Sequence, residues 1–134
     1  MIQYIDKQKN DFSCGPIALL NALKWRGEKL TYRKDYQRLV RLCNTDKFGT
    51  YDKDFFKALN TSGFKFKTTQ LYSEIVDHLK KGGSVILAHL DCSNDWHYSF
   101  WYEYRFNKFY GANIDTRKSI KFVREKTMRK YLLS

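Results

Sequence analysis

The chain has 134 residues, of which 43% are hydrophobic and 17% aromatic. This length and composition predict one folded domain, 1–134, with its own core, and exclude intrinsic disorder. The 25 Lys and Arg residues outnumber the 14 Asp and Glu residues, giving a formal charge of +11. Nucleic acid is therefore a possible partner, but the basic residues are scattered, which favours a solvated surface. No apolar run reaches membrane-spanning length, so no membrane contact is expected, and nothing indicates an oligomeric state.

The chain contains three cysteines, so at least one thiol stays free of a disulfide. The first ten residues lack the apolar stretch of a secretory signal, and we therefore expect a cytoplasmic protein. The spacing of Cys14, Cys43 and Cys92 includes no paired metal ligands. No metal and no organic cofactor is expected.

The first half of the chain predicts three helices. Apolar residues recur at helical spacing after Cys14, and Gly15-Pro16 suit a first helical turn, whose N–H groups have no partner within the helix. Thr31 is the expected N-cap of the second helix. The three predicted helices cover residues 14–26, 31–42 and 51–59.

The second half predicts strands and two short helices. Residues 64–68 alternate Phe with Lys, the pattern of a half-buried strand, and the apolar run 85–90 is typical of a central strand. Ser73 is the expected cap of a short helix. The remaining predicted elements are helix 73–81, strands 96–106, 108–113 and 119–123, and a final helix 126–133. Helices followed by antiparallel strands predict an α+β fold, in which N-terminal helices pack on a C-terminal, mostly antiparallel sheet.

Cys14 is the leading candidate for a catalytic residue. It lies at the predicted N-terminus of a helix, where the helix dipole and unpaired N–H groups stabilise a thiolate and lower the thiol pKa. The alternative is a small buried hydrophobic residue. Cys43, late in an amphipathic helix, is expected to be structural, and Cys92 to lie in a surface loop.

A thiol nucleophile needs a base, and the chain has three histidines. His78 is expected to be solvated. His89 ends a predicted strand and is either a packed histidine or a second candidate for the base. His97 follows a polar loop, where a side chain can meet a helix N-terminus across a cleft, and is the favoured general acid and base.

Two further roles complete such a site. Asn113, on the strand after His97, is the favoured residue to orient the imidazole, and Asp115 is the alternative, since strand alternation points it to the same face. The backbone N–H of Cys14 is a candidate oxyanion donor. Gln8, just upstream, could supply a second donor from its side-chain amide.

These residues resemble a known family. Gln8, five further residues, Cys14-Gly15-Pro16 and an apolar helix together resemble the opening of the bacteriocin-processing, double-glycine-leader peptidases, which are papain-like, and of their free-standing relatives. Further resemblances lie in Phe48-Gly49-Thr50, in the segment 79–87, in Trp96-His97-Tyr98-Ser99-Phe100 and in the segment 108–113.

The resemblance implies a papain-like fold and a site in which Gln8 holds the oxyanion, Cys14 is the nucleophile, His97 is the general acid and base, and Asn113 orients His97. Many relatives have Asp followed by Pro at the third position, where this chain has Asn113-Ile114. This departure keeps Asp115 open as the orienting residue.

The predicted function is that of a cysteine peptidase, with a resting thiolate–imidazolium pair of Cys14 and His97, an acyl-enzyme intermediate and a peptide or protein substrate. Three alternatives stay open. The chain could be a thiol-dependent acyl or peptidyl transferase or a deconjugating enzyme. It could also be an inactive papain-like binding module, or a basic nucleic-acid-binding protein whose affinity falls steeply with salt.

Overall fold

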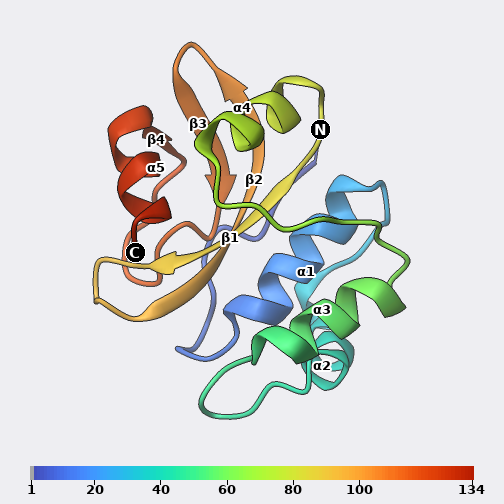
Figure 1. The fold of residues 1–134 in the computed structure, drawn as a ribbon. Helices are drawn as coiled ribbons and strands as arrows, with labels where there is room; N and C mark the ends of the chain where they lie inside the picture. Colours follow the sequence, from blue (N-terminus) through green and yellow to red (C-terminus); the bar gives the residue numbers. More distant parts are fainter. Residues whose placement is uncertain (1) are drawn as a thin grey trace.

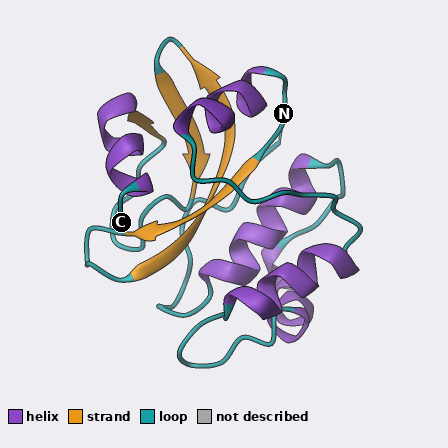
Figure 2. Cartoon of the chain, in the orientation of Figure 1, coloured by secondary structure: helices purple, strands orange, loops and turns teal. Residues whose placement is uncertain are grey.

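The computed structural model describes residues 2–134 and has an α+β architecture. Four antiparallel strands form one sheet in the order β1-β2-β3-β4. Figure 1 shows α1, α2 and α3 gathered on one side of the sheet and α4 and α5 on the other, and Figure 2 separates helices from strands. The elements of this described part are α1 (Cys14–Trp25), α2 (Tyr32–Leu42), α3 (Asp52–Thr61), α4 (Tyr72–Lys80), β1 (Val85–Leu90), β2 (Trp96–Arg105), β3 (Lys108–Ala112), β4 (Phe122–Arg124) and α5 (Glu125–Leu132).

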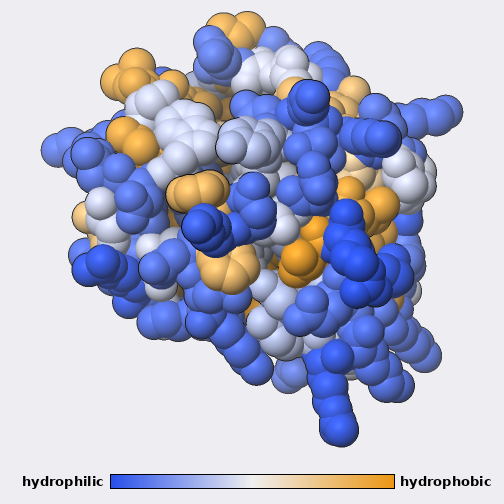
Figure 3. All heavy atoms as spheres, turned by 90° about the horizontal axis from the view of Figure 1, so that it is seen from below, coloured by the Kyte–Doolittle hydropathy of each residue, from blue (hydrophilic) through white to orange (hydrophobic). Residues whose placement is uncertain are grey.

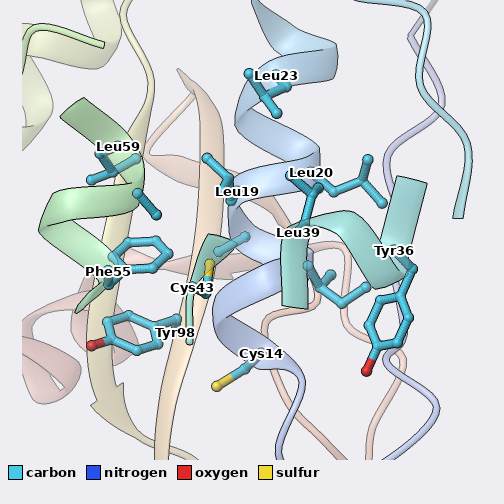
Figure 4. Close-up of a cluster of buried hydrophobic side chains, with 13 residues drawn as sticks. Cys14, Leu19, Leu20, Leu23, Tyr36, Leu39, Cys43, Phe55, Leu59 and Tyr98 are labelled. Atoms are coloured by element: carbon cyan, nitrogen blue, oxygen red, sulfur yellow. The ribbon is translucent and has the colours of Figure 1, made fainter. Parts of the chain in front are cut away.

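Two hydrophobic cores lie on opposite faces of the sheet. The first joins α1, α2 and α3 to Tyr98 of β2, and Figure 4 shows its side chains. The second joins α4 and α5 to residues such as Trp101 and Phe109. Because successive side chains of a strand point to opposite faces, His97 shares the face of Trp101, whereas Tyr98 faces the helices. The start of β2 therefore contributes to both cores.

Helix α1 is the central element of the first core. Every residue from Cys14 to Leu23 is buried, so the helix is enclosed on nearly all sides. Ser13 occupies the N-cap but its side chain makes no capping hydrogen bond. The backbone N–H groups of the first turn are thus left for other partners, and Cys14 is the first residue of that turn.

The helix predictions are confirmed with small shifts of their ends. The predicted cap of α2 is also confirmed, because the Thr31 hydroxyl accepts a hydrogen bond from the Lys34 N–H at 3.2 Å. The predicted cap of α4 is wrong. That helix begins at Tyr72, one residue before Ser73, and Leu71 occupies the N-cap position without a side-chain hydrogen bond.

The predicted strand 64–68 is also wrong. Residues 64–71 run in an irregular, largely exposed path between α3 and α4, and no strand in the range 2–134 pairs with them. Phe66 is 42% exposed, so the Phe and Lys alternation does not separate a buried face from a solvated one. The last predicted strand, 119–123, forms only as Phe122–Arg124, because its start runs through a loop.

The sequence contains no apolar run of membrane-spanning length, and the helices of the structure can be compared with this observation. None of the helices within residues 2–134 combines the length and the apolar character that crossing a bilayer requires.

Gly15 sets how closely the loop before α3 packs on α1. A Cβ at Gly15 would fall within 2.8 Å of the Thr50 Cβ and closer still to the Thr50 hydroxyl oxygen. We expect Gly15→Ala to lower the free energy of unfolding by about 1–3 kcal/mol, the usual effect of overpacking. Urea denaturation measures this loss.

A double-mutant cycle tests the cause. Thr50→Gly removes the three atoms that lie nearest to the new methyl group, so the combined variant should be more stable than the sum of the single effects predicts. Additive losses would show that Gly15 is needed for a reason other than the contact with Thr50.

Candidate active site

The Cys14 thiol lies where β2 extends beyond β3. The pairing of these strands begins at Phe100 with Ala112, so the earlier residues of β2 have no β3 neighbour. The N–H group of Tyr98, the residue after His97, instead faces the Cys14 sulfur, as do the N–H groups of Cys14 and Gly15. Figure 4 shows Cys14 at the first turn of α1, in the core that also contains Tyr98. The start of α1 and the start of β2 therefore meet at this sulfur.

The expected lowering of the thiol pKa is not found. Burial is the largest influence and raises the pKa of Cys14, although hydrogen bonds from the Tyr98, Gly15 and Cys14 N–H groups lower it in part. Only 7% of Cys14 is exposed, so water cannot solvate a thiolate there. The helix N-terminus is in place, but burial outweighs it. Burial therefore favours the neutral thiol over the thiolate of an ion pair.

His97 is fully buried and bonded through only one ring nitrogen. Its Nε2 lies 2.5 Å from the main-chain oxygen of Asn113. A carbonyl oxygen only accepts hydrogen bonds, so Nε2 carries the proton and donates it. The other nitrogen, Nδ1, is buried and finds no hydrogen-bond partner within the described chain. It carries the lone pair of a neutral imidazole, which is the form that a general base requires.

Burial also acts on the charge state of His97. It lowers the pKa of His97, and the interaction with the Asn113 carbonyl opposes this only in part. The carboxylates of Asp91 and Asp115 favour the charged ring more weakly. At neutral pH the His97 ring is thus neutral. Burial of the two residues therefore works against the resting ion pair that the sequence predicted.

Asn113 contacts His97 through its backbone rather than through its side chain. The residue follows β3 and has a φ of 53°, in the left-handed region that Asn tolerates better than most residues. This turn aims the main-chain carbonyl at the His97 ring. The sequence predicted Asn113 beside His97, and the structure brings the two residues together through a different atom.

The Asn113 side chain is committed to Gln8. The Asn113 Nδ2 donates to the Gln8 Oε1 at 2.9 Å, and the Gln8 backbone N–H donates to the Asn113 Oδ1 at 3.1 Å. The Gln8 Nε2 donates one of its two protons to the Asn10 carbonyl at 2.6 Å. Gln8 is buried and fixed at three points, and its second Nε2 proton is available to a ligand.

Asp115 makes no hydrogen bond to His97. Its carboxylate accepts from the backbone N–H and the thiol of Cys92, at 2.9 and 3.0 Å, and from the N–H groups of Arg117 and Lys118. It thereby holds the loop that follows β3. Its effect on His97 is that of a nearby negative charge.

His89 is the second buried imidazole, and its hydrogen bonds occupy both ring nitrogens. Nδ1 lies 2.9 Å from the Leu90 carbonyl oxygen and Nε2 lies 2.8 Å from the Ser99 hydroxyl. No lone pair remains for a substrate. Of the two histidines considered as the base, only His97 keeps a buried ring nitrogen without a hydrogen-bond partner among the described residues. The third histidine, His78, is exposed on α4, as expected.

The other two thiols lie as expected. Cys43 is fully buried in the first core, where burial raises its pKa to about 12, and Cys92 is exposed in the loop after β1. Across residues 2–134, no group of three or more His, Cys, Asp or Glu side chains is arranged to hold a metal ion.

A groove of about 1270 Å³ lies beside the site. Tyr98 lines it together with Phe55 of α3, β1, the segment 64–71 and the exposed Trp96. Figure 3 shows one face of the molecule, where hydrophobic atoms emerge between hydrophilic ones. The groove is largely apolar and reaches Tyr98, the residue next to His97, whereas Cys14 and His97 themselves do not line it. Its volume is large enough to hold a chain of several residues.

Sequence reasoning missed three parts of the site. These are the Asn113 carbonyl, the Tyr98 N–H and the hydrogen-bonded partners of His89. The first two leave no mark in residue identity, because backbone groups are the same in every residue. The β2 pattern of His97, Ser99 and Trp101 on one face was the available signal for the last of these.

The comparisons with known proteins agree on the fold. No family model and no curated protein matches the sequence. Among solved structures, the peptidase domain of Streptococcus ComA, a bi-functional ABC transporter of a quorum-sensing pathway, is similar with a TM-score of 0.79 and 18% identity, over 98% of this chain and 92% of that one. The peptidase domain of Streptococcus mutans ComA has a TM-score of 0.68 and 16% identity, over 96% and 91%.

A third structure is a double glycine motif protease from an AMS/PCAT transporter, in complex with the leader peptide. It has a TM-score of 0.66 and 16% identity, over 94% of this chain and 82% of that one. The chain therefore has the papain-like α+β fold of these peptidase domains, as its resemblance to the double-glycine-leader peptidases implied.

The buried state of His89 predicts a pH dependence of stability. Burial, with a smaller effect of His97, lowers the pKa of His89 to about 4, below the ordinary value of 6.5, although the Leu90 carbonyl and the Asp91 and Asp115 carboxylates oppose this. The unfolded chain therefore binds more protons than the folded chain between these pH values. The stabilising effect of a neutral His89 is complete above pH 6.5 and is lost as the pH falls towards 4.

We expect the loss to reach about 3 kcal/mol across that range, from the size of the pKa difference. Denaturant unfolding at a series of pH values measures it, and His89→Phe, which cannot titrate, should flatten the curve. An equally steep curve in that variant would assign the dependence to other groups.

Proposed function

We propose that this chain is a cysteine peptidase in which Cys14 attacks a peptide carbonyl and His97 transfers the proton. The observation that carries the proposal is the state of His97. Its Nε2 proton is committed to the Asn113 carbonyl, and its Nδ1 lone pair is buried with no partner in the described structure. A histidine that serves packing alone would have both nitrogens engaged, as His89 does.

The neutral pair sets the order of proton transfer. As the Cys14 sulfur forms a bond to the carbonyl carbon, the thiol proton passes to His97 Nδ1. The C–N bond then breaks and His97 returns this proton to the departing amine, leaving an acyl-enzyme. Water next gives a proton to Nδ1 and attacks the thioester carbon, and the proton returns to the sulfur as the S–C bond breaks.

Donors are available for the oxygen that becomes negative during each attack. The Cys14 N–H lies at the open first turn of α1, and Gln8 keeps one Nε2 proton unused. The dry surroundings that raise the thiol pKa also strengthen these hydrogen bonds in the transition state. Burial thus disfavours the thiolate of the resting enzyme but strengthens the hydrogen bonds to the oxygen that becomes negative in the transition state.

A peptide is the substrate class that the groove supports. Its lining is mostly apolar, and it extends from Trp96 and Tyr98 along β1 to the segment 64–71. A structurally similar protease is known in complex with a leader peptide, which is consistent with this use of the fold. We propose that several residues of an extended peptide lie in this groove, with the scissile bond at Cys14.

The test is cleavage of a proteome-derived peptide library, with new termini identified by mass spectrometry. Wild type should give a consistent set of cleaved sequences. Cys14→Ala and His97→Ala should give none, and Gln8→Ala should lower kcat about a hundredfold, the usual effect of removing one oxyanion donor. Cys43→Ala is the matched control, since it removes a buried thiol of the same core and should retain activity.

Other outcomes would replace the proposal. Products that form only when an amine is added would show a transferase. Peptide binding without cleavage, equally strong in wild type and in Cys14→Ala, would show a binding module. Cleavage that survives Cys14→Ala would exclude this site.

A second prediction separates the side-chain roles of Asn113 and Asp115. Asn113→Gly keeps the left-handed turn and the carbonyl on His97 but removes the amide that holds Gln8. We expect it to lower kcat roughly tenfold or more, and to add nothing to the effect of Gln8→Ala, because both changes remove one oxyanion donor. Asp115→Asn should have a smaller effect, since Asp115 does not touch His97.

Steady-state kinetics on the peptide identified above measures these effects. A larger loss in Asp115→Asn than in Asn113→Gly would show that the Asp115 carboxylate matters more to catalysis than the amide that holds Gln8. Additive losses in the double variant of Gln8 and Asn113 would show that the two amides act separately.

A further inference from the structure

His89 faces His97 from the neighbouring strand. The two residues are direct partners in the register of β1 with β2, so their side chains lie on the same face of the sheet. The ring centroids are 5.7 Å apart and the ring planes meet at 83°, an edge-to-face contact. Each ring is fully buried.

The His89 ring is itself fixed by a directional chain of hydrogen bonds. The Trp101 Nε1–H donates to the Ser99 hydroxyl oxygen at 2.8 Å. Ser99 can then donate its own proton to the His89 Nε2, and the His89 Nδ1 donates to the Leu90 carbonyl. Every member of this chain is satisfied when His89 is neutral.

Tyr131 of α5 covers the ring of His89 by stacking. Their ring centroids are 4.0 Å apart with an interplanar angle of 25°. His89 is therefore bonded at both nitrogens and packed between Tyr131 and His97. It has no freedom to move away from either neighbour.

His97, by contrast, is anchored by the single hydrogen bond to Asn113. One bond at Nε2 does not fix the plane of an imidazole, because the ring can still turn about the bonds of its own side chain. The direction of the Nδ1 lone pair depends on that plane. The contact with the rigid ring of His89 is one restraint on that plane.

We infer that His89, held by Ser99, Trp101 and Tyr131, is a positioning residue that sets the ring plane of His97 and so directs the Nδ1 lone pair. His89 touches neither the thiol nor the peptide in this scheme, and it acts only through His97. The neutral form matters as well, since a charged His89 would repel the imidazolium that His97 becomes during the reaction. This inference rests on the proposed function for its consequence in catalysis, but the geometry that it describes is measurable without a substrate.

The first measurement is the orientation of the His97 ring in the full chain at neutral pH, taken from NMR distance restraints between its ring protons and the neighbouring side chains. Wild type should show a single ring plane, with the Nε2 proton on the Asn113 carbonyl. His89→Ala should give more than one ring plane while Nε2 keeps its proton, because the ring is no longer held. His89→Phe restores a ring at this position and should recover the single plane.

The second measurement is kinetics on the peptide that wild type cleaves. His89→Ala should lower kcat roughly tenfold to a hundredfold, the effect of a misplaced catalytic group, with KM changed by no more than about twofold. Val123→Ala is the control, because it opens a cavity in the same core layer. A general loosening of the core would appear equally in both variants.

The outcomes separate this inference from the proposed function. If the ring plane of His97 changes in His89→Ala but not in Val123→Ala while wild type cleaves no peptide, the positioning role stands and the peptidase proposal fails. If wild type is an active peptidase and His89→Ala matches Val123→Ala in spectrum and kcat, the positioning role is overturned. If His89→Ala does not fold, Ser99→Ala, which removes one donor to His89, should show the same change of His97 to a lesser degree, and an unchanged spectrum overturns the inference.

Discussion

The hydrogen bond from the His97 ring to the main-chain carbonyl of Asn113 determines how the site is arranged. It fixes the proton on Nε2 and leaves the lone pair on Nδ1, which is what separates a general base from a packed histidine. The same residue binds Gln8 through its side chain, so one left-handed turn at the end of β3 organises both the proposed base and the proposed oxyanion donor. A change in that turn would therefore affect both proposed roles together.

Burial is the second constraint. The thiol and the imidazole are both withdrawn from water, which favours the neutral form of each at rest. A helix N-terminus and three backbone N–H groups do not overcome the desolvation of a thiolate with only 7% of its residue exposed. An arriving peptide would supply the electrophile at the moment the proton moves, so a stable charged pair is not required. Positioning of the two groups then matters more than their resting pKa values.

The sequence predicted the parts of this structure that depend on side-chain pattern. The helices, the central strands and the α+β order follow from the periodicity of apolar residues, and Cys14 at a helix start followed from Gly15-Pro16. The strand predicted at 64–68 failed because alternation describes one segment, whereas a strand needs a neighbour to pair with. Residues 64–71 border the groove rather than the sheet edge.

For the site residues, the sequence likewise predicted which residues lie near one another but not which of their atoms make the contacts. Gln8 and Asn113 were predicted by residue type and do lie together with His97, but the atoms that make the contacts differ from those expected. A main-chain carbonyl took the part assigned to the Asn113 amide, and that amide binds Gln8 instead. Residue identity cannot reveal such an exchange, since it depends on a φ of 53° at a single position. An exchange of amide for carboxylate at position 113 therefore changes the contact with Gln8 directly and affects His97 only indirectly. Asn can thus stand where many of the peptidases that this chain resembles have Asp, because the hydrogen bond from His97 to the main-chain carbonyl is kept.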